Sequence, residues 1–178
     1  AAYNLLRRYL EDPTKWAPGV VWEPASIGAV EGHPNHVNSI VFDTVYWTSL
    51  GVPDDGCPGV PAEQNYNAET NPAGVRCTLA DYMINVFGPR PERLWGPQEK
   101  QIGRGFAAPA LGDVGVQFGL LPLMDRQITP AQFVDLNEKI GGIDIDGDFV
   151  PQRKAADLEA LRILYETGRM NSGTGAAD

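Results

Sequence analysis

The sequence has no run of about 18 apolar residues, the length that a helix needs to cross a membrane. Basic residues are also scarce, because 14 Lys and Arg stand against 23 Asp and Glu, giving a formal net charge of −9. Nucleic acids and anionic membrane surfaces both attract a basic face. We therefore expect a chain without a membrane span, and we expect neither nucleic acid nor a membrane as a partner.

The Gly-x-Ser-x-Gly sequence of serine hydrolases is also missing. In that motif the nucleophilic serine sits on a sharp turn between a strand and a helix. The nearest match, Pro-Ala-Ser-Ile-Gly around Ser26, lacks the first glycine and a preceding strand pattern. A triad of Ser26, His33 and Asp43 satisfies the residue types, but no local pattern supplies the turn or an oxyanion hole. We expect no catalytic residue of this kind within the chain.

The chain has two histidines, both in the segment Glu31-Gly-His33-Pro-Asn-His36. With Asp43 as a further ligand, His33 and His36 form a candidate zinc site, and with it a small metal-dependent hydrolase. Structural zinc takes four ligands, however, and no Cys-x-x-Cys accompanies the pair. Pro34 also prevents a regular helix through the segment. The favoured interpretation is a polar loop that leads into a helix.

The two cysteines, Cys57 and Cys77, lie at the ends of a segment rich in Pro, Gly and Asn. A disulfide between them would close a polar loop that cannot build a core of its own. Two free thiols would instead behave as small buried hydrophobes. Because the loop is polar, we favour the disulfide and, with it, a secreted or periplasmic location.

The tightest acidic cluster is Asp144-Ile-Asp146-Gly-Asp148. Three carboxylates at alternating positions of a short loop are ligands that Ca²⁺ prefers, so calcium is a candidate cofactor. The loop is not an EF-hand, because its glycine comes too early and no carboxylate stands at the last position. The favoured alternative is an acidic turn whose aspartates cap backbone amides or pair with Arg153 and Lys154.

Helical periodicity dominates the chain and predicts a mainly α fold of about five to six helices with long loops, resembling a cap or insertion. The clearest helix begins at Thr129-Pro130, with Gln132 at the return position of a capping box. Gly141-Gly142 ends it. Further helices are expected over 3–10, 37–50, 78–87, 112–126 and 157–167, and loops over 51–76 and 89–109. The β-branched content of 37–50 leaves a strand as its alternative.

One domain is expected over residues 1–178, a length that allows a substantial core. Within it, we expect an irregular N-terminal arm over 1–36, apart from the short helix, and a helical core over 37–170. The tail over 171–178 is flexible by composition. The first residues lack the layout of a signal peptide, so an export signal would have been removed or would belong to a longer precursor.

A resemblance to a known family rests on GFAAPALGDVGVQFGLLPL (105–123), QITPAQFVDLNEKIGGIDIDGDFVPQR (127–153) and ETGRMNSG (166–173). These runs resemble the C-terminal half of a family of large, functionally uncharacterised secreted bacterial proteins. The members of that family look like α/β-hydrolases related to tannase-type esterases. The resemblance extends over about 38–173. It implies that the nucleophilic serine lies upstream of this region and the acid and histidine downstream, so no triad residue is transferred to a position here.

Three functions are therefore considered. The resemblance implies a cap, or lid, of a secreted α/β-hydrolase-like esterase that shapes a substrate entrance without carrying the triad. Its partners would be the remainder of a larger hydrolase-like protein or a companion chain, and a small-molecule ester. The alternative is an extracellular, non-enzymatic binding module that calcium stabilises. The third function is the metal-dependent hydrolase centred on His33 and His36.

Overall fold

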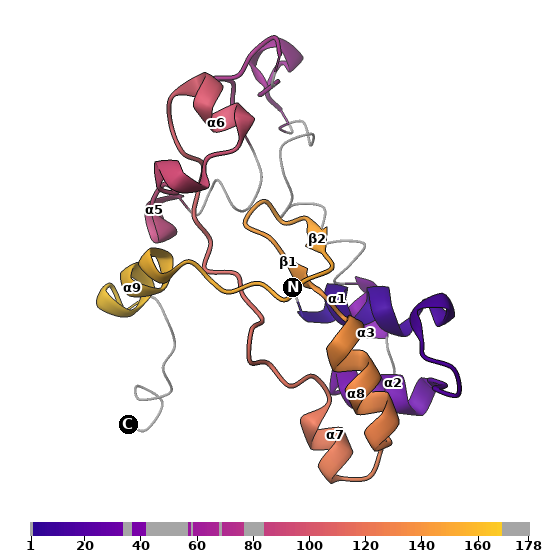
Figure 1. Cartoon of the computed structure of the whole chain (residues 1–178). Helices are drawn as coiled ribbons and strands as arrows, with labels where there is room; N and C mark the ends of the chain where they lie inside the picture. Colours follow the sequence, from indigo (N-terminus) through magenta and orange to yellow (C-terminus); the bar gives the residue numbers. More distant parts are fainter. Residues whose placement is uncertain are drawn as a thin grey trace. The chain divides into compact units, whose positions relative to one another are not determined.

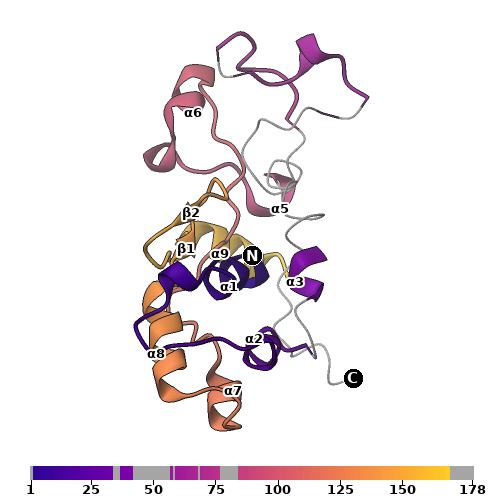
Figure 2. The ribbon, with the colours of Figure 1, turned by 90° about the vertical axis from the view of Figure 1, so that its right-hand side faces the viewer.

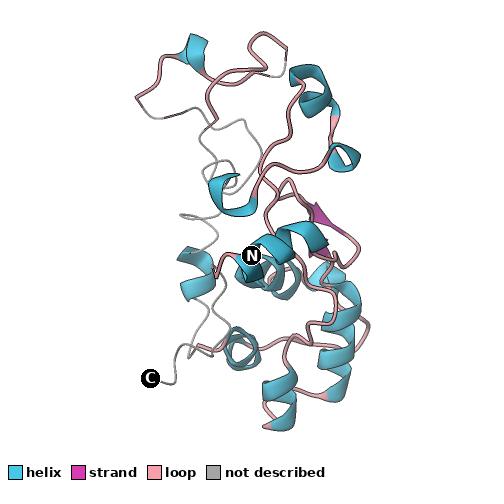
Figure 3. Ribbon diagram, turned by 90° about the vertical axis from the view of Figure 1, so that its left-hand side faces the viewer, coloured by secondary structure: helices cyan, strands magenta, loops and turns pink. Residues whose placement is uncertain are grey.

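The structure is a computed structural model of the chain, and it describes residues 2–33, 37–41, 57, 59–67, 69–76 and 84–168. Helices and loops dominate these residues, with one short pair of strands (Figures 1 and 3). The mainly α class is thereby confirmed. The chain divides into two compact units: unit 1 is 1–48, 112–144 and 148–155, and unit 2 is 49–111, 145–147 and 156–178. Each unit combines segments that lie far apart in the sequence. This division does not test the single domain expected over 1–178, which stays a prediction.

The described helices and strands have the following bounds. The α-helices are α1 (Ala2–Leu10), α2 (Pro24–Glu31), α3 (Val37–Val41), α5 (Ile84–Phe87), α6 (Pro97–Ile102), α7 (Leu120–Met124), α8 (Pro130–Lys139) and α9 (Leu158–Glu166). Short 3-10 turns occur at Pro13–Lys15, Ala62–Gln64 and Glu92–Leu94. Strand β1 (Gly142–Ile143) pairs antiparallel with β2 (Phe149–Val150), and Gly142 lies opposite Val150.

Unit 1 is built around the apolar faces of α1 and α8. Helix α1 contacts α2 and α3, α2 contacts α7, and α7 contacts α8 (Figure 2). A fully buried aliphatic or aromatic side chain contributes about 1.5–3 kcal/mol relative to an exposed one. The buried apolar residues of this unit include Leu5, Leu6, Tyr9, Leu10, Trp22, Ile27, Phe118, Ile128, Leu136, Ile140 and Ile143.

Helix α8 has the capping contacts that the sequence predicts. The Thr129 hydroxyl accepts the backbone N–H of Gln132 at 3.2 Å, and the Gln132 side-chain oxygen accepts the backbone N–H of Thr129 at 2.7 Å. Leu136 and Ile140 are buried on the expected face, and the helix ends at Lys139, before the glycine pair. The predicted bounds of this helix are confirmed.

The predicted buried helix over 112–126 is wrong, because α7 covers Leu120–Met124 alone. Gly115 and Gly119 adopt φ of +85° and +79°, in the left-handed region, which interrupts a right-handed helix. The backbone before α7 bonds elsewhere: the N–H of Phe118 donates to Asn137 Oδ1 at 2.9 Å. Phe118 is buried as expected, whereas three other residues of the predicted apolar stripe are exposed, namely Val114, Leu121 and Met124.

The remaining predicted segments agree with the structure to different degrees. Helices α1 and α9 occupy the predicted places near 3–10 and 157–167, and Asp157 caps α9. Helix α2 lies within the expected N-terminal arm over 1–36. Helix α6 occupies part of the segment 89–109, where a loop is expected. Of the helices predicted over 37–50 and 78–87, the structure has α3 and α5. Residues 42–50, 77–83 and 171–178 lie outside the described residues.

Unit 2 has a smaller core around Phe106, Ala107 and Ala108, all buried. The guanidinium carbon of Arg76 lies 3.2 Å from the centroid of the Phe106 ring, and Tyr66 meets this ring edge-on. Helices α5 and α9 contact each other in this unit. In neither unit is any helix among the described residues both long enough and apolar enough to span a bilayer.

Candidate functional site

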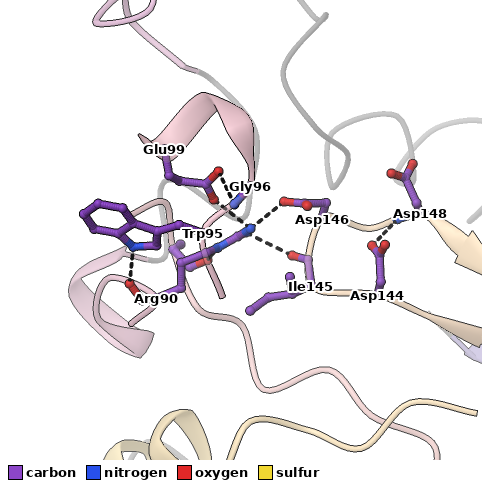
Figure 4. Close-up of polar contacts among 9 residues, drawn as sticks. Arg90, Trp95, Gly96, Glu99, Asp144, Ile145, Asp146 and Asp148 are labelled. Atoms are coloured by element: carbon purple, nitrogen blue, oxygen red, sulfur yellow. Dashed lines mark hydrogen bonds and ion pairs between the residues drawn. The ribbon is translucent and has the colours of Figure 1, made fainter. Parts of the chain in front are cut away.

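Arg90 is the centre of a buried ion cluster in unit 2 (Figure 4). Its side chain is 3% exposed and its Nη1 lies 2.9 Å from Glu99 Oε1 and 2.6 Å from Asp146 Oδ1. Its remaining donors bond to backbone, since Nε donates to the Ala107 carbonyl at 3.2 Å and Nη2 to that of Ile145 at 3.3 Å. The two carboxylates and the two carbonyl oxygens compensate the buried charge, as a buried guanidinium requires.

The backbone around Arg90 is fixed by close contacts. Trp95 Nε1 donates to the Arg90 carbonyl at 3.0 Å. A Cβ on Gly105 would lie 2.4 Å from this carbonyl oxygen, so glycine is required there. Glu99 also accepts the N–H of Gly96 at 3.1 Å through Oε2, at the start of α6. The Glu99 carboxylate thus caps the N-terminus of α6 and also pairs with Arg90.

The acidic loop between β1 and β2 has the contacts of a turn. Asp144 Oδ1 accepts the backbone N–H of Asp148 at 2.9 Å, and the Asp144 N–H donates to the Asp148 carbonyl at 2.9 Å. Asp146 pairs with Arg90, as described above. The predicted capping of a backbone amide is therefore present, and the cation that pairs with Asp146 is Arg90.

Arg153 instead pairs with Asp113, whose Oδ2 lies 3.1 Å from its Nη1. The backbone N–H of Lys154 donates to Asp113 Oδ1 at 2.8 Å. Arg153 also lies over the Phe118 ring, 4.8 Å from its centroid. Two arginines of the segment 89–109 pair with aspartates, since Arg90 pairs with Asp146 and Arg93 with Asp157.

Within the described residues, no three His, Cys, Asp or Glu side chains are grouped so that they could hold a metal ion. Calcium at Asp144, Asp146 and Asp148 stays a hypothesis, which thermal melting can test.

We expect calcium and magnesium at equal millimolar concentrations to shift the melting temperature slightly and equally, because both then only screen a net charge of −9. A calcium site would raise the free energy of unfolding by about 2.7 kcal/mol when calcium is a hundredfold above its Kd. Differential scanning fluorimetry measures the shift. A rise with calcium alone, lost in Asp148→Asn and kept in the control Asp125→Asn, would establish the metal site instead.

His33 contacts Tyr3 of α1. Tyr3 Oη and His33 Nε2 lie 2.6 Å apart, and the two rings stack with centroids separated by 5.5 Å. Two members of the candidate zinc site, His36 and Asp43, lie outside the described residues. The zinc hypothesis is therefore untested, and the contact to Tyr3 gives His33 a packing role.

Ser26 lies in α2, and its hydroxyl donates to the carbonyl of Gln127 at 3.4 Å. It does not sit on a turn between a strand and a helix, as a hydrolase nucleophile does. Of the two cysteines, Cys57 is buried, with 4% of its surface exposed. Cys77 lies outside the described residues, so the disulfide remains a prediction.

Sequence reasoning missed a groove of about 570 Å³ in unit 1, called here the α1–α8 groove. Its lining comes from α1, the turn after it, the end of α8 and β2: Arg8, Tyr9, Lys15, Glu138, Lys139, Ile140, Gly141, Phe149, Val150 and Pro151. The guanidinium carbon of Arg8 lies 3.9 Å from the centroid of the Phe149 ring. The sequence places Arg8 on the polar side of a short helix, but no local pattern links it to Phe149.

A buried carboxylate, Asp135, contacts two residues that line this groove, Tyr9 and Lys139. Tyr9 donates to Asp135 Oδ2 at 2.5 Å, the N–H of Ala17 donates to the same oxygen at 2.9 Å, and Lys139 Nζ lies 2.6 Å from Oδ1. Burial, together with the hydrogen bond to Asp135, raises the pKa of Tyr9 well above its usual value. Burial alone would raise the pKa of Asp135, but the bonds from Lys139, Tyr9 and Ala17 outweigh it and lower this pKa. Asp135 is thus a carboxylate at neutral pH and fixes α1 against α8.

Comparison with known proteins identifies one family. A family model described as "Tannase-like family of unknown function (DUF6351)" matches residues 1–178. No curated protein and no solved structure matches the chain.

Proposed function

Because the chain belongs to the tannase-like family of unknown function, we propose that it is a cap region of a secreted α/β-hydrolase-like esterase. The cap shapes the entrance for a small-molecule ester. Bond cleavage belongs to catalytic residues in the remainder of a larger protein or on a companion chain. Caps of this kind exclude water and position the substrate while other residues carry the chemistry.

One observation carries this proposal: the family model matches the chain over residues 1–178, yet the chain has no Gly-x-Ser-x-Gly sequence. The surroundings of Ser26 support the same conclusion. Its hydroxyl bonds to a backbone carbonyl oxygen, and the residue lies within helix α2 and not on a turn between a strand and a helix. The α1–α8 groove adds a surface on which part of a substrate can lie.

An extracellular binding module without enzymatic activity is the second candidate, and the same groove favours it. The two functions differ in what accompanies the chain. A cap works beside a catalytic domain with a nucleophile elbow and a late histidine, whereas a binding module works without one. The groove would hold a ligand in either case.

We expect residues 1–178 alone to hydrolyse a p-nitrophenyl ester no faster than buffer does, because a hydrolase without its nucleophile retains little beyond binding. Release of p-nitrophenol is followed by absorbance, with Ser26→Ala as the diagnostic variant and Ser172→Ala as the matched control. Strong turnover that Ser26→Ala abolishes and Ser172→Ala leaves intact would refute the cap function.

A further inference from the structure

We propose that the α1–α8 groove binds an organic monocarboxylate, with Arg8 holding the carboxylate and the wall around Phe149 contacting the body of the ligand. This inference names the ligand class of the cap and in that respect rests on the proposed function. Binding to the groove is measured on the chain itself, however, so the two can fail separately.

Arg8 has the properties of a preorganised carboxylate ligand. Its guanidinium lies over the Phe149 ring, 3.9 Å from the centroid, which orients the planar donor fork. The residue is exposed, and within the described residues its guanidinium makes no hydrogen bond or ion pair. A guanidinium presents five N–H donors and binds a carboxylate through two parallel hydrogen bonds. In the groove, these donors are available to a ligand.

The two lysines of the groove already have partners. Lys139 Nζ lies 2.6 Å from Asp135 Oδ1. Lys15 Nζ donates to the Arg8 carbonyl oxygen at 2.5 Å and lies 3.4 Å from Asp12 Oδ2. Both lysines therefore already have a carboxylate partner, whereas the Arg8 guanidinium has none among the described residues and is the preferred anion-binding group of the groove.

The apolar lining of the groove favours an organic anion over an inorganic one. Ile140, Phe149, Val150 and Pro151 give it an apolar side next to Arg8. A bare inorganic anion would gain nothing from this surface, whereas an apolar ligand body buries area against it. The volume of about 570 Å³ also lies in the range of small-molecule sites, about 300–1,000 Å³.

Glu138 limits the charge of the ligand. It lines the same groove and is exposed, with no ion pair to a described residue. A second anionic group on the ligand would be repelled by its carboxylate. One carboxylate, bound by Arg8, is therefore the charge that the groove accepts.

Binding to residues 1–178 is measured by calorimetric titration with phenylacetate, its neutral analogue phenylacetamide and inorganic phosphate. We expect saturable binding of phenylacetate. The Kd of phenylacetamide should be higher by about tenfold or more, since hydrogen bonds between charged groups are worth about twice neutral ones. Phosphate should not displace phenylacetate at equal concentration, because it makes no contact with the apolar wall.

Variants locate the site. Arg8→Gln should weaken phenylacetate about tenfold and leave phenylacetamide unchanged. Arg7→Gln removes the same charge from the same helix, but Arg7 lies outside the groove and pairs with Glu11 at 2.7 Å. This control should change the Kd by less than about twofold. Glu138→Gln should tighten phenylacetate binding, because it removes the repelling carboxylate.

Four results would overturn the proposal: no saturable binding of phenylacetate, equal binding of the acid and the amide, equal losses in Arg7→Gln and Arg8→Gln, or displacement by equal phosphate. Melting curves of each variant check that it folds. If the protein as its source produces it carries no hydrolase segment, the cap function would be refuted, whereas carboxylate binding by the groove would stand. If the full protein is a hydrolase but the groove fails these binding tests, the carboxylate site would be refuted and the cap function would stand.

Discussion

Replacing Arg90 by leucine should lower the free energy of unfolding by about 3–5 kcal/mol, the usual cost of removing one partner from a buried ion pair. Glu99, 2% exposed, would keep a buried negative charge without its cation. The carbonyls of Ala107 and Ile145 would lose their donors as well. Urea denaturation followed by circular dichroism measures the change.

Arg93→Leu is the matched control for Arg90→Leu. Arg93 pairs with Asp157 at 2.8 Å, but its side chain is 59% exposed, so its loss should cost less than about 1 kcal/mol. The double variant Arg90→Leu with Glu99→Leu should recover part of the loss, because the uncompensated charge is removed. Equal costs for Arg90→Leu and Arg93→Leu would show that the buried cluster has no special weight.

Loss of the proposed disulfide should lower the free energy of unfolding by about 3 kcal/mol, because the cross-link restricts the unfolded chain. Cys77→Ala is the variant of choice, since Cys57 is buried and its replacement would add a packing cost of its own. The same variant under reducing conditions should show no further loss. This separates the cross-link from other effects of the reductant.

Intact mass gives an independent check of the disulfide. Without reductant, the protein should be lighter than its reduced form by two hydrogens. Alkylation of two thiols in the denatured, unreduced protein would show that Cys57 and Cys77 are not bonded. In that case the argument for an extracytoplasmic location from cysteine pairing would also be lost.

Local signals account for the part of the fold that the sequence predicts correctly. Thr129 and Gln132 bond to each other within one turn, so the capping box that begins α8 is formed by neighbours in the sequence. The segment over 112–119 has apolar residues at helical spacing, yet its backbone bonds to distant partners. Asn137 accepts the N–H of Phe118, and the Lys154 carbonyl accepts that of Asp113. Such contacts are tertiary, and periodicity cannot reveal them.

The candidate site likewise has features that the sequence shows and features that only the fold shows. The sequence shows basic residues within 89–109 and aspartates within 144–148, but the bond between Arg90 and Asp146 appears only in the structure. Which arginine is buried depends on the close approach of Gly105 and on Glu99, both set by packing. The α1–α8 groove requires Arg8 and Phe149 to lie together, although they are far apart in the sequence. It becomes visible only in the fold.

The central claim is that this chain is a non-catalytic part of a tannase-like hydrolase. Its most direct test is the intact mass and the full reading frame of the protein as its source produces it. The claim predicts a protein several times longer, with a Gly-x-Ser-x-Gly sequence before this segment and a histidine of the triad after it. A protein that consists of these 178 residues alone would contradict it.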